Sequence, residues 1–221
     1  MCGGTAFALV DVLGDALVQQ WRLDACEARY IRRQQGFHCT ACRSTMRCMV
    51  LAIAIHRLFG WGGTFDAFVR GDEARMLDTL EINEAGGLSA AFAKLPRHRI
   101  VRYPEVDMLS LPYGDAEFDL VVHSDTLEHV RDPVAGLAEC RRVLRPGGAC
   151  AFTVPMLVGR LTRDRTGLPE SFHGTPADGR GYLTYTEFGA DAWRFTVAAG
   201  FSECRIVALD SPTAHAFVAI R

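Results

Sequence analysis

Two histidines of this 221-residue chain are candidates for acid–base chemistry. His129 follows directly after an acidic residue, Glu128, and His173 lies in a stretch that contains several glycines and arginines. An imidazole has an unperturbed pKa near neutrality, so either ring can exchange a proton at physiological pH. His129 has an equally good structural interpretation, in which its ring holds a helix end through a hydrogen bond. Both histidines are therefore candidate catalytic residues.

The clearest structural elements that could position such residues lie in the second half of the chain. Phe118–His123 is an apolar run typical of a strand that is buried on both faces. Asp132 and Pro133 then supply a helix N-cap and a first helical residue, and Pro146-Gly147-Gly148 ends that helix. Cys150–Val154 is expected to form the next strand. A β-α-β unit of this kind predicts a parallel sheet with helices on its faces.

The C-terminal part of the chain predicts one more helix and two more strands. A helix is expected over Thr184–Ala199, because Thr184 and Glu187 have the spacing of a capping box. Cys204–Leu209 and Ala214–Ile220 are expected to be strands, and four residues separate them. So short a connection predicts an antiparallel hairpin.

Four short motifs follow one another along the chain in a fixed order. They are Leu111-Pro112-Tyr113, Phe118-Asp119-Leu120-Val121-Val122, Leu127-Glu128-His129-Val130 and Leu144-Arg145-Pro146-Gly147-Gly148. The succession resembles the LPF, FDLV, LEHV and LRPGG motifs of the class I methyltransferases, over about residues 75–221. The resemblance implies an α/β, Rossmann-like sheet that is mostly parallel and ends in an antiparallel hairpin. We place this domain at residues 71–221, after a helical, cysteine-containing N-terminal subdomain at residues 1–70.

The resemblance also implies S-adenosylmethionine as cofactor, bound at the carboxyl ends of the strands. Glu81 matches the acid that opens the glycine-rich turn of the family, and Gly87 matches its last glycine. Asn83 and Ala85 replace the first two glycines, and Gly86 is additional. Asparagine tolerates left-handed backbone angles, so the turn can persist, whereas an alanine leaves less room for a ligand. The alternative interpretation is a glycine-containing turn that binds nothing.

The interval that follows that turn is short. The first strand is expected over Arg75–Ile82, and 18 residues separate Leu88 from Asp107. The family fits a helix, a strand, a second helix and a second strand into this interval. Here Ser89–Leu95 allows one short helix and Arg99–Tyr103 one strand. We therefore expect one helix–strand pair to be missing and the sheet to have six strands.

The remaining cofactor contacts are implied by the same resemblance. Glu105 would accept the ribose hydroxyls, Asp107 would contact the adenine amino group, and Met108 would pack on the adenine ring. Ser124 and Asp125 would line the amino-acid end of the cofactor. A solvated loop charge is the alternative interpretation of Glu105 and of Asp107. The full set of expected cofactor contacts is Glu81, Asn83, Gly86, Gly87, Glu105, Asp107, Met108, Ser124 and Asp125.

A substrate-facing insertion is expected over Met156–Leu183, where this family commonly varies. Its glycines, prolines and arginines suit a lid that excludes water and orients an acceptor. His173 lies in this segment and is the second candidate base. Methyl transfer depends mainly on in-line positioning of the two reactants, so a dedicated base is not required.

The eight cysteines include one pair with the spacing of a metal site. Cys39 and Cys42 form a C-x-x-C knuckle, with His38 adjacent and Cys26 and Cys48 on either side. The segment resembles the second half of the zinc ribbon that precedes some methyltransferase domains. A first C-x-x-C pair is absent, which favours a degenerate ribbon retained for packing over bound zinc. Redox chemistry is a third interpretation, and no metal ligand is assigned.

Composition limits the classes of partner. The formal net charge of −2 provides no broad basic field, so nucleic acid and anionic membranes are not expected partners. The sequence shows no export signal, so reduced cysteines and a cytoplasmic location are expected.

Three functions are compatible with these observations. The first is methyl transfer from S-adenosylmethionine to a small-molecule or saccharide-type acceptor. The second is a catalytically inactive, methyltransferase-like binding or scaffold module. The third, a nicotinamide-dependent oxidoreductase, requires a G-x-G-x-x-G turn that residues 83–88 do not supply. A homodimer through the apolar N-terminal helices is an open alternative for the oligomeric state.

Overall fold

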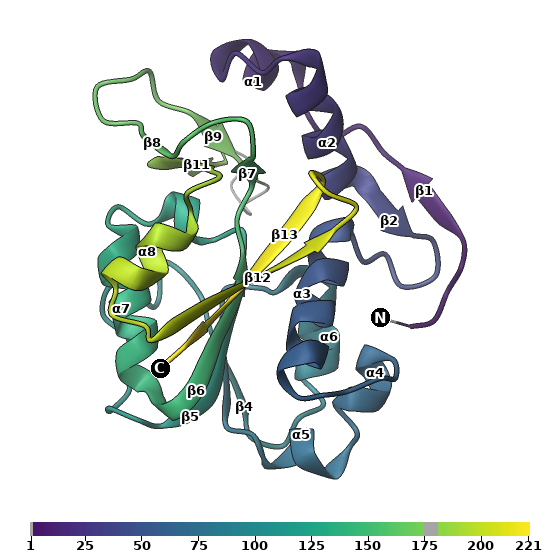
Figure 1. The fold of residues 1–221 in the computed structure, drawn as a ribbon, viewed down its shortest axis with the longest axis vertical. Helices are drawn as coiled ribbons and strands as arrows, with labels where there is room; N and C mark the ends of the chain where they lie inside the picture. Colours follow the sequence, from purple (N-terminus) through teal and green to yellow (C-terminus); the bar gives the residue numbers. More distant parts are fainter. Residues whose placement is uncertain (1, 175–180) are drawn as a thin grey trace.

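A six-stranded sheet forms the centre of the molecule (Figure 1). The computed structural model describes residues 2–174 and 181–221. In spatial order the strands are β12 (Glu203–Leu209), β13 (Ala214–Ile220), β6 (Leu144–Thr153), β5 (Phe118–Ser124), β3 (Thr79–Ile82) and β4 (His98–Val101). Strands β4, β3, β5 and β6 are parallel, whereas β13 is antiparallel to both β6 and β12. The predicted parallel sheet with a closing hairpin is therefore confirmed.

The sheet is one helix–strand pair short, as the spacing of the sequence predicts. Residues 102–117, which join β4 to β5, form turns and bends without helix or strand. Strand β4 consequently pairs with β3 alone and lies at the edge of the sheet. The predicted six-strand count is confirmed.

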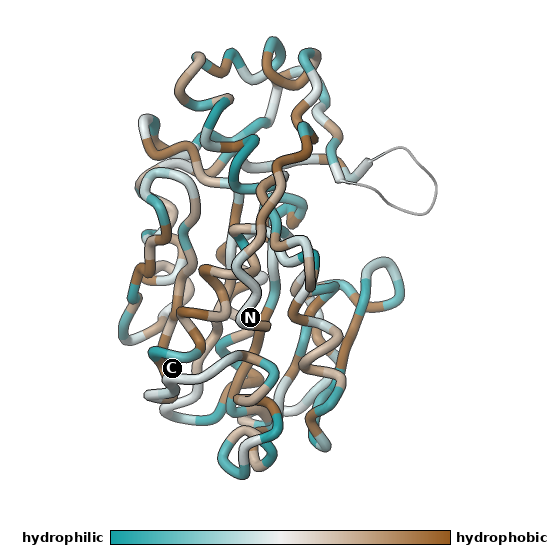
Figure 2. Tube along the Cα trace, turned by 90° about the vertical axis from the view of Figure 1, so that its right-hand side faces the viewer, coloured by the Kyte–Doolittle hydropathy of each residue, from teal (hydrophilic) through white to brown (hydrophobic). Residues whose placement is uncertain are grey.

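Helices cover both faces of this sheet. Helix α3 (Met46–Leu58) packs against β13, β12 and β6, whereas α7 (Pro133–Val143) and α8 (Trp193–Ala198) lie on the opposite face (Figure 1). Side chains alternate between the two cores along each strand, because successive residues of a strand point to opposite faces. Leu120 and Val122 join the core under α3, and Val121 joins the core under α7. Hydrophobic stretches, brown in Figure 2, accordingly run through the middle of the molecule.

The N-terminal part of the chain contains two short strands and several helices. Strand β1 (Phe7–Leu9) pairs in antiparallel fashion with β2 (Phe37–Cys39). The helices before the sheet are α1 (Asp15–Gln20), α2 (Ala25–Gly36), α4 (Phe65–Phe68) and α5 (Asp72–Met76), together with α3. Since α3 shares a core with the sheet, residues 1–70 contribute to the packing of the domain that follows. The division of the chain at residue 70 stays a prediction.

Short elements complete the fold. The turn after β3 contains η1 (Gly86–Leu88) and α6 (Ser89–Phe92), and η2 (Leu127–His129) follows β5. The segment between β6 and α8 holds β7 (Met156–Leu157), β8 (Arg163–Asp164), β9 (Phe172–His173), β10 (Tyr182–Leu183) and β11 (Thr186–Gly189). This segment corresponds to the predicted lid, although its residues 175–180 lie outside the described residues.

Two predicted elements differ from the structure. The chain is helical over α5 and becomes a strand only from Thr79, so the strand predicted over Arg75–Ile82 begins too early. Asp72 and Glu73 lie in the first turn of α5, where acidic side chains interact favourably with the helix dipole. The helix predicted over Thr184–Ala199 is also wrong in its first half, where β11 is a strand.

The second error has a physical cause in Glu187, whose carboxylate is not available to cap a helix. It is buried, and it forms ion pairs with Arg163 at 2.7 Å and with Arg165. Strand β11 lies between β7 and β8, and the arginine partners come from β8 and the residue that follows it. The helix is therefore confined to Trp193–Ala198.

The lid segment is joined to the N-terminal helices at one end of the molecule (Figure 1). Arg160 donates to the Glu27 carboxylate at 2.6 Å and to the carbonyl oxygen of Trp21 at 2.9 Å. The indole nitrogen of Trp21 donates to Ser171 Oγ at 2.8 Å. The lid is thus held against α1 and α2. None of the helices within residues 2–174 and 181–221 has the length and apolar character needed to cross a membrane.

Candidate functional site

Polar side chains gather where β3 and β5 end. Asn83 follows β3 with a φ of +58°, so it adopts the left-handed conformation that asparagine tolerates. Its Oδ1 accepts a hydrogen bond from the Tyr103 amide at 3.0 Å, and its Nδ2 donates to Thr126 Oγ1 at 3.4 Å. Asn83 therefore links the loops that follow β3, β4 and β5.

Glu81 is fully buried and holds the turn together from within. Its Oε1 accepts hydrogen bonds from the Ala85 amide at 2.7 Å and from the Ser89 hydroxyl, and its Oε2 lies 2.8 Å from His98 Nε2. Because both carboxylate oxygens have protein partners, Glu81 orders the residues around the site. Its expected direct contact with the cofactor stays a prediction.

The two glycines of the turn contact the N-terminal segment closely. A Cβ atom on Gly86 would lie 2.7 Å from Cys48 Sγ, and one on Gly87 would lie 2.6 Å from Ser44 Oγ and 3.2 Å from Ser44 Cα. Both positions therefore need glycine because the start of α3 approaches the turn. This contact was not anticipated from the sequence, where the glycines suggested room for a ligand.

Asp125 is the centre of a charged cluster at the end of β5. One carboxylate oxygen accepts hydrogen bonds from Arg47 Nη1 and Gln35 Nε2, both at 2.6 Å, and the other accepts from Thr153 Oγ1 at 2.9 Å. Burial alone would raise the pKa of Asp125, but the Arg47 charge and the hydrogen bonds hold it below the usual range. Ser124 lies beside it, with its hydroxyl 2.8 Å from Thr153 Oγ1.

Arg47 is the functional candidate that the sequence reasoning missed. It lies in the first turn of α3, and its side chain is 27% exposed. The Asp125 charge raises its pKa, so the guanidinium stays protonated. Its Nε atom is buried and has no hydrogen-bond partner among the described residues. The feature of the sequence that could have identified Arg47 is its position shortly after the C-x-x-C pair.

The other expected adenosine contacts lie apart from this cluster. Glu105 and Asp107 are exposed in the loop after β4, where Asp107 Oδ1 accepts a hydrogen bond from the Leu109 amide at 2.9 Å. Met108 is 4% exposed and packs in the hydrophobic core, within reach of Gly136 of α7. Met108 therefore anchors the loop to the hydrophobic core under α7. Ribose and adenine recognition by these residues stays a prediction.

The two candidate bases lie next to each other. The ring centroids of His129 and His173 are 4.6 Å apart, although the residues belong to η2 and to β9 of the lid. Buried Glu128 lies between them and the protein interior, with its Oε1 3.6 Å from His129 Nε2 and 3.7 Å from His173 Nε2. The sequence thus identified both histidines without indicating that the fold brings them together.

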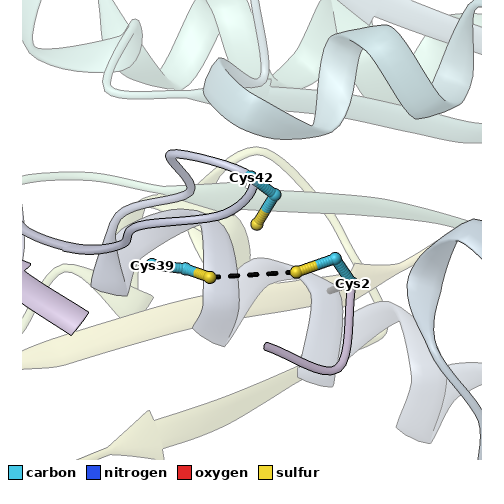
Figure 3. Close-up of side chains that lie close together, drawn as sticks. All are labelled: Cys2, Cys39 and Cys42. Carbon is cyan, nitrogen blue, oxygen red and sulfur yellow. Dashed lines mark hydrogen bonds between the residues drawn. The ribbon is translucent and has the colours of Figure 1, made fainter. Parts of the chain in front are cut away.

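The cysteine cluster includes Cys2, which the sequence did not indicate. Cys2 points toward Cys39 and Cys42 (Figure 3), and the three sulfur atoms lie within 4.8 Å of one another. Cys26 and Cys48 lie elsewhere: Cys26 is exposed on α2, and Cys48 faces the Gly86 turn. Burial would raise the pKa of Cys42, but hydrogen bonds with the side chain and backbone of Ser44 lower it to about 7.

The geometry of the three thiols can be compared with that of a zinc site. The Cys2 and Cys39 sulfur atoms are 3.8 Å apart, which is about the separation of two thiolates bound to one tetrahedral zinc ion. Structural zinc sites use four protein ligands, and no fourth metal-binding side chain among the described residues joins the three thiols. The donor set therefore fits zinc in type and spacing but is one protein ligand short.

The mostly parallel six-stranded sheet with its closing hairpin is the Rossmann-like sheet that the sequence resemblance implies. Residues 76–152 match the family described as a methyltransferase domain. A "probable S-adenosylmethionine-dependent methyltransferase" of Mycolicibacterium smegmatis is 35% identical over 101 residues, which cover 43% of this chain and 36% of the relative. A demethylmenaquinone methyltransferase of Corynebacterium kroppenstedtii is 36% identical over 90 residues, which cover 37% and 39% of the two chains.

Residues 76–152 therefore mark a methyltransferase domain within the chain. The chain spans between a third and two fifths of the length of these two curated relatives. A solved S-adenosylmethionine-dependent methyltransferase from Mesorhizobium loti superposes with a TM-score of 0.45 at 14% identity, over 72% of this chain and 99% of that one.

Proposed function

We propose that this protein binds S-adenosylmethionine at the carboxyl edge of β3 and β5 and transfers its methyl group to a small-molecule or saccharide-type acceptor. The Arg47–Asp125 pair is the observation that carries the proposal. The amino-acid end of the cofactor bears one carboxylate and one ammonium group. A guanidinium and a carboxylate side by side are complementary to these two charges.

The two residues are well suited to this task. The Nε–H of Arg47 has no partner among the described residues and can donate a hydrogen bond to an anionic oxygen, and Asp125 stays ionised because its pKa is lowered. Gln35 and Thr153 fix the Asp125 carboxylate in place before any ligand arrives, which reduces the cost of ordering the site on binding. Asn83 keeps the neighbouring loops in register.

The chemistry that S-adenosylmethionine supplies when bound is a methyl group on a positively charged sulfur. The protein then has to orient the acceptor, exclude water and hold a proton acceptor where the acceptor requires one. The lid segment is held over this end of the sheet by the Arg160 contacts. His129 of η2 and His173 of the lid lie side by side and are the candidate bases of the proposal.

A surface hollow on the lid favours a small polar molecule as the acceptor. This hollow beside the two histidines is lined by Arg131, Arg165, Thr184 and Tyr185, among others. The Arg131 guanidinium lies over the Tyr185 ring at 5.3 Å from its centroid. Arginine and tyrosine side chains of this kind can donate hydrogen bonds to the hydroxyl or carboxylate groups of a small polar molecule.

Calorimetric titration with S-adenosylhomocysteine tests the cofactor site. We expect binding to the wild-type chain and at least about tenfold weaker binding to Arg47→Met and Asp125→Asn, because a charged hydrogen bond contributes about 1.5–3 kcal/mol. Methylthioadenosine, which lacks the amino-acid end, is the matched ligand control. Its affinity should be the same for all three chains.

Three results would contradict the proposal. Absence of S-adenosylhomocysteine binding at millimolar concentration would exclude the cofactor site. If the variants bound both ligands more weakly by the same factor, Arg47 and Asp125 would support the fold and would not contact the amino-acid end of the cofactor. Wild-type binding without methyl transfer to any polar acceptor would support the non-catalytic module instead.

A further inference from the structure

The carboxylate of Glu128 has an unusual position for a charged group. The residue is 1% exposed, and neither carboxylate oxygen has a hydrogen-bond partner among the described residues. A buried carboxylate without hydrogen bonds is strongly unfavourable, so such groups are normally paired or bound to a cation. The charge of Arg47 lies near enough to interact with Glu128, but neither carboxylate oxygen receives a hydrogen bond from it.

The groups nearest to Glu128 Oε1 are two imidazole nitrogens. His129 Nε2 lies 3.6 Å away and His173 Nε2 lies 3.7 Å away, so neither makes a hydrogen bond with it. The three ligand-type atoms all lie within 4.8 Å of one another. Two ligands of one zinc ion are about 3.4 Å apart when each is about 2.1 Å from the metal at a tetrahedral angle. The two distances from the carboxylate oxygen to the imidazole nitrogens exceed this by a few tenths of an ångström.

The other nitrogen of each ring is already engaged. His129 Nδ1 lies 3.0 Å from the carbonyl oxygen of Leu183, and His173 Nδ1 lies 2.9 Å from Thr184 Oγ1. A carbonyl oxygen can only accept, so Nδ1 of His129 carries the proton and Nε2 of the neutral ring presents a lone pair. Metal-binding histidines are held by the same type of hydrogen bond from the distal nitrogen.

We propose that Glu128, His129 and His173 bind one divalent transition-metal ion. Two imidazoles and one carboxylate form a ligand set typical of zinc and of non-haem iron, and it leaves further coordination positions open for water or another oxygen ligand. Imidazole nitrogens disfavour magnesium and calcium, which prefer sites made of oxygen ligands. The ion would neutralise Glu128 and join η2 to β9, thereby fixing the lid to the end of β5.

With the ion bound, the two histidines hold the metal and do not act as bases. The proposal does not depend on cofactor binding, because its readout is metal binding by the full chain. Protein freed of metal by a chelator is titrated with Co²⁺. We expect one equivalent of Co²⁺ to bind with visible d–d bands of a nitrogen and oxygen ligand field. Binding at the Cys2, Cys39 and Cys42 thiols is distinguished by thiolate-to-cobalt charge-transfer bands in the near ultraviolet.

Substitutions assign the bands to the proposed ligands. Glu128→Gln and His173→Gln should lose the nitrogen and oxygen bands and keep any thiolate bands. His173 is partly exposed on the lid, so its substitution tests the site even where Glu128→Gln disturbs folding, which circular dichroism checks. Thr184→Val removes the partner of His173 Nδ1 and should weaken Co²⁺ binding at least about tenfold. Exposed Glu170→Gln is the matched control and should bind as the wild type does.

Either of two outcomes overturns the proposal. One is the absence of nitrogen and oxygen bands at millimolar Co²⁺. The other is an unchanged spectrum in both Glu128→Gln and His173→Gln. In those cases no metal ion compensates the charge of Glu128, whereas S-adenosylhomocysteine binding is unaffected by the result.

Discussion

The guanidinium of Arg47 and the carboxylate of Asp125 meet at 2.6 Å, although the two residues are 78 positions apart in the chain. Arg47 belongs to the N-terminal segment and Asp125 to the loop that follows β5. The contact places the first turn of α3 at the end of β5, at the carboxyl edge of the sheet. Ser44 and Cys48 meet the glycine turn in the same region.

This ion pair should contribute to stability as well as to binding. Asp125→Asn and Arg47→Met each leave a largely buried charge without its partner, and each is expected to lower the free energy of unfolding by about 3 kcal/mol. The double variant should lose less than the sum of the two, because neither charge then remains unpaired. Urea unfolding of the four chains measures the coupling. Additive losses would show that the two side chains act independently.

The close approach of Ser44 to Gly87 predicts that the glycine cannot be replaced without cost. A Cβ at position 87 would meet the Cα of buried Ser44 at 3.2 Å as well as its hydroxyl, so a change of rotamer does not relieve the contact. Gly87→Ala should destabilise the protein by about 1–3 kcal/mol. Thermal unfolding measures the loss.

Two further variants separate this contact from a general effect of losing a glycine. Ser44→Gly, combined with Gly87→Ala, should recover part of the stability. Gly62→Ala is the control, since a Cβ at that position meets no atom within 4 Å. An equal loss in Gly62→Ala, or no recovery in the double variant, would contradict the close contact.

Buried His123 should make the protein sensitive to mild acid. Its ring is fully buried and stacks on Phe152 with centroids 4.8 Å apart, and burial lowers its pKa from 6.5 to about 3. The unfolded chain therefore binds a proton below pH 6.5 that the folded chain does not. Stability contributed by the neutral ring is present above pH 6.5 and decreases by about 1.4 kcal/mol for each pH unit below it.

Urea unfolding at several pH values between 6.5 and about 5 measures this slope. His123→Leu should flatten it. Phe152→Leu, which alters the same stack without removing a titrating group, should lower stability at every pH and keep the slope. An unchanged slope in His123→Leu would show that His123 is not responsible.

The thiol of Cys42 should react at lower pH than an ordinary cysteine. Its pKa is lowered to about 7, so iodoacetamide should alkylate it with a rate midpoint near pH 7. Ser44→Ala removes the hydroxyl that hydrogen-bonds to the sulfur, and the midpoint should rise. Mass spectrometry of the modified peptide measures the rate. Joint protection of Cys2, Cys39 and Cys42 by Zn²⁺ would show that the cluster binds the ion, and an unchanged midpoint in Ser44→Ala would contradict the role of the hydroxyl.

The parts of the fold that the sequence predicted correctly are governed by local rules. Asp132 caps α7 as expected, with its carboxylate accepting from the Ala135 amide at 3.0 Å. The hairpin of β12 and β13 follows from a connection of four residues. The failed helix at Thr184 shows the limit. Glu187 has the right spacing for a cap, but its carboxylate is used by arginines more than 20 residues away in the chain.

In the candidate site, too, the features set by local sequence were predicted and those set by distant contacts were not. The loops that hold Asn83 and Asp125 could be located, because motifs identify the ends of strands. Arg47 could not be assigned to them, since its contact with Asp125 depends on how α3 packs across the sheet. The convergence of His129 with His173 was likewise hidden, because it depends on the path of the lid between β6 and β11.

The missing helix–strand pair leaves β4 as a short edge strand, whose outward amide and carbonyl groups have no neighbouring strand within the sheet. Such an edge invites another chain to add a strand and begin aggregation. Charged side chains on and beside β4 oppose this: Arg99 pairs with Glu117 at 3.1 Å, and Arg102 pairs with Glu84 at 3.2 Å. The sheet that lacks one helix–strand pair thus ends in an edge strand flanked by ion pairs, and these charges disfavour self-association through β4.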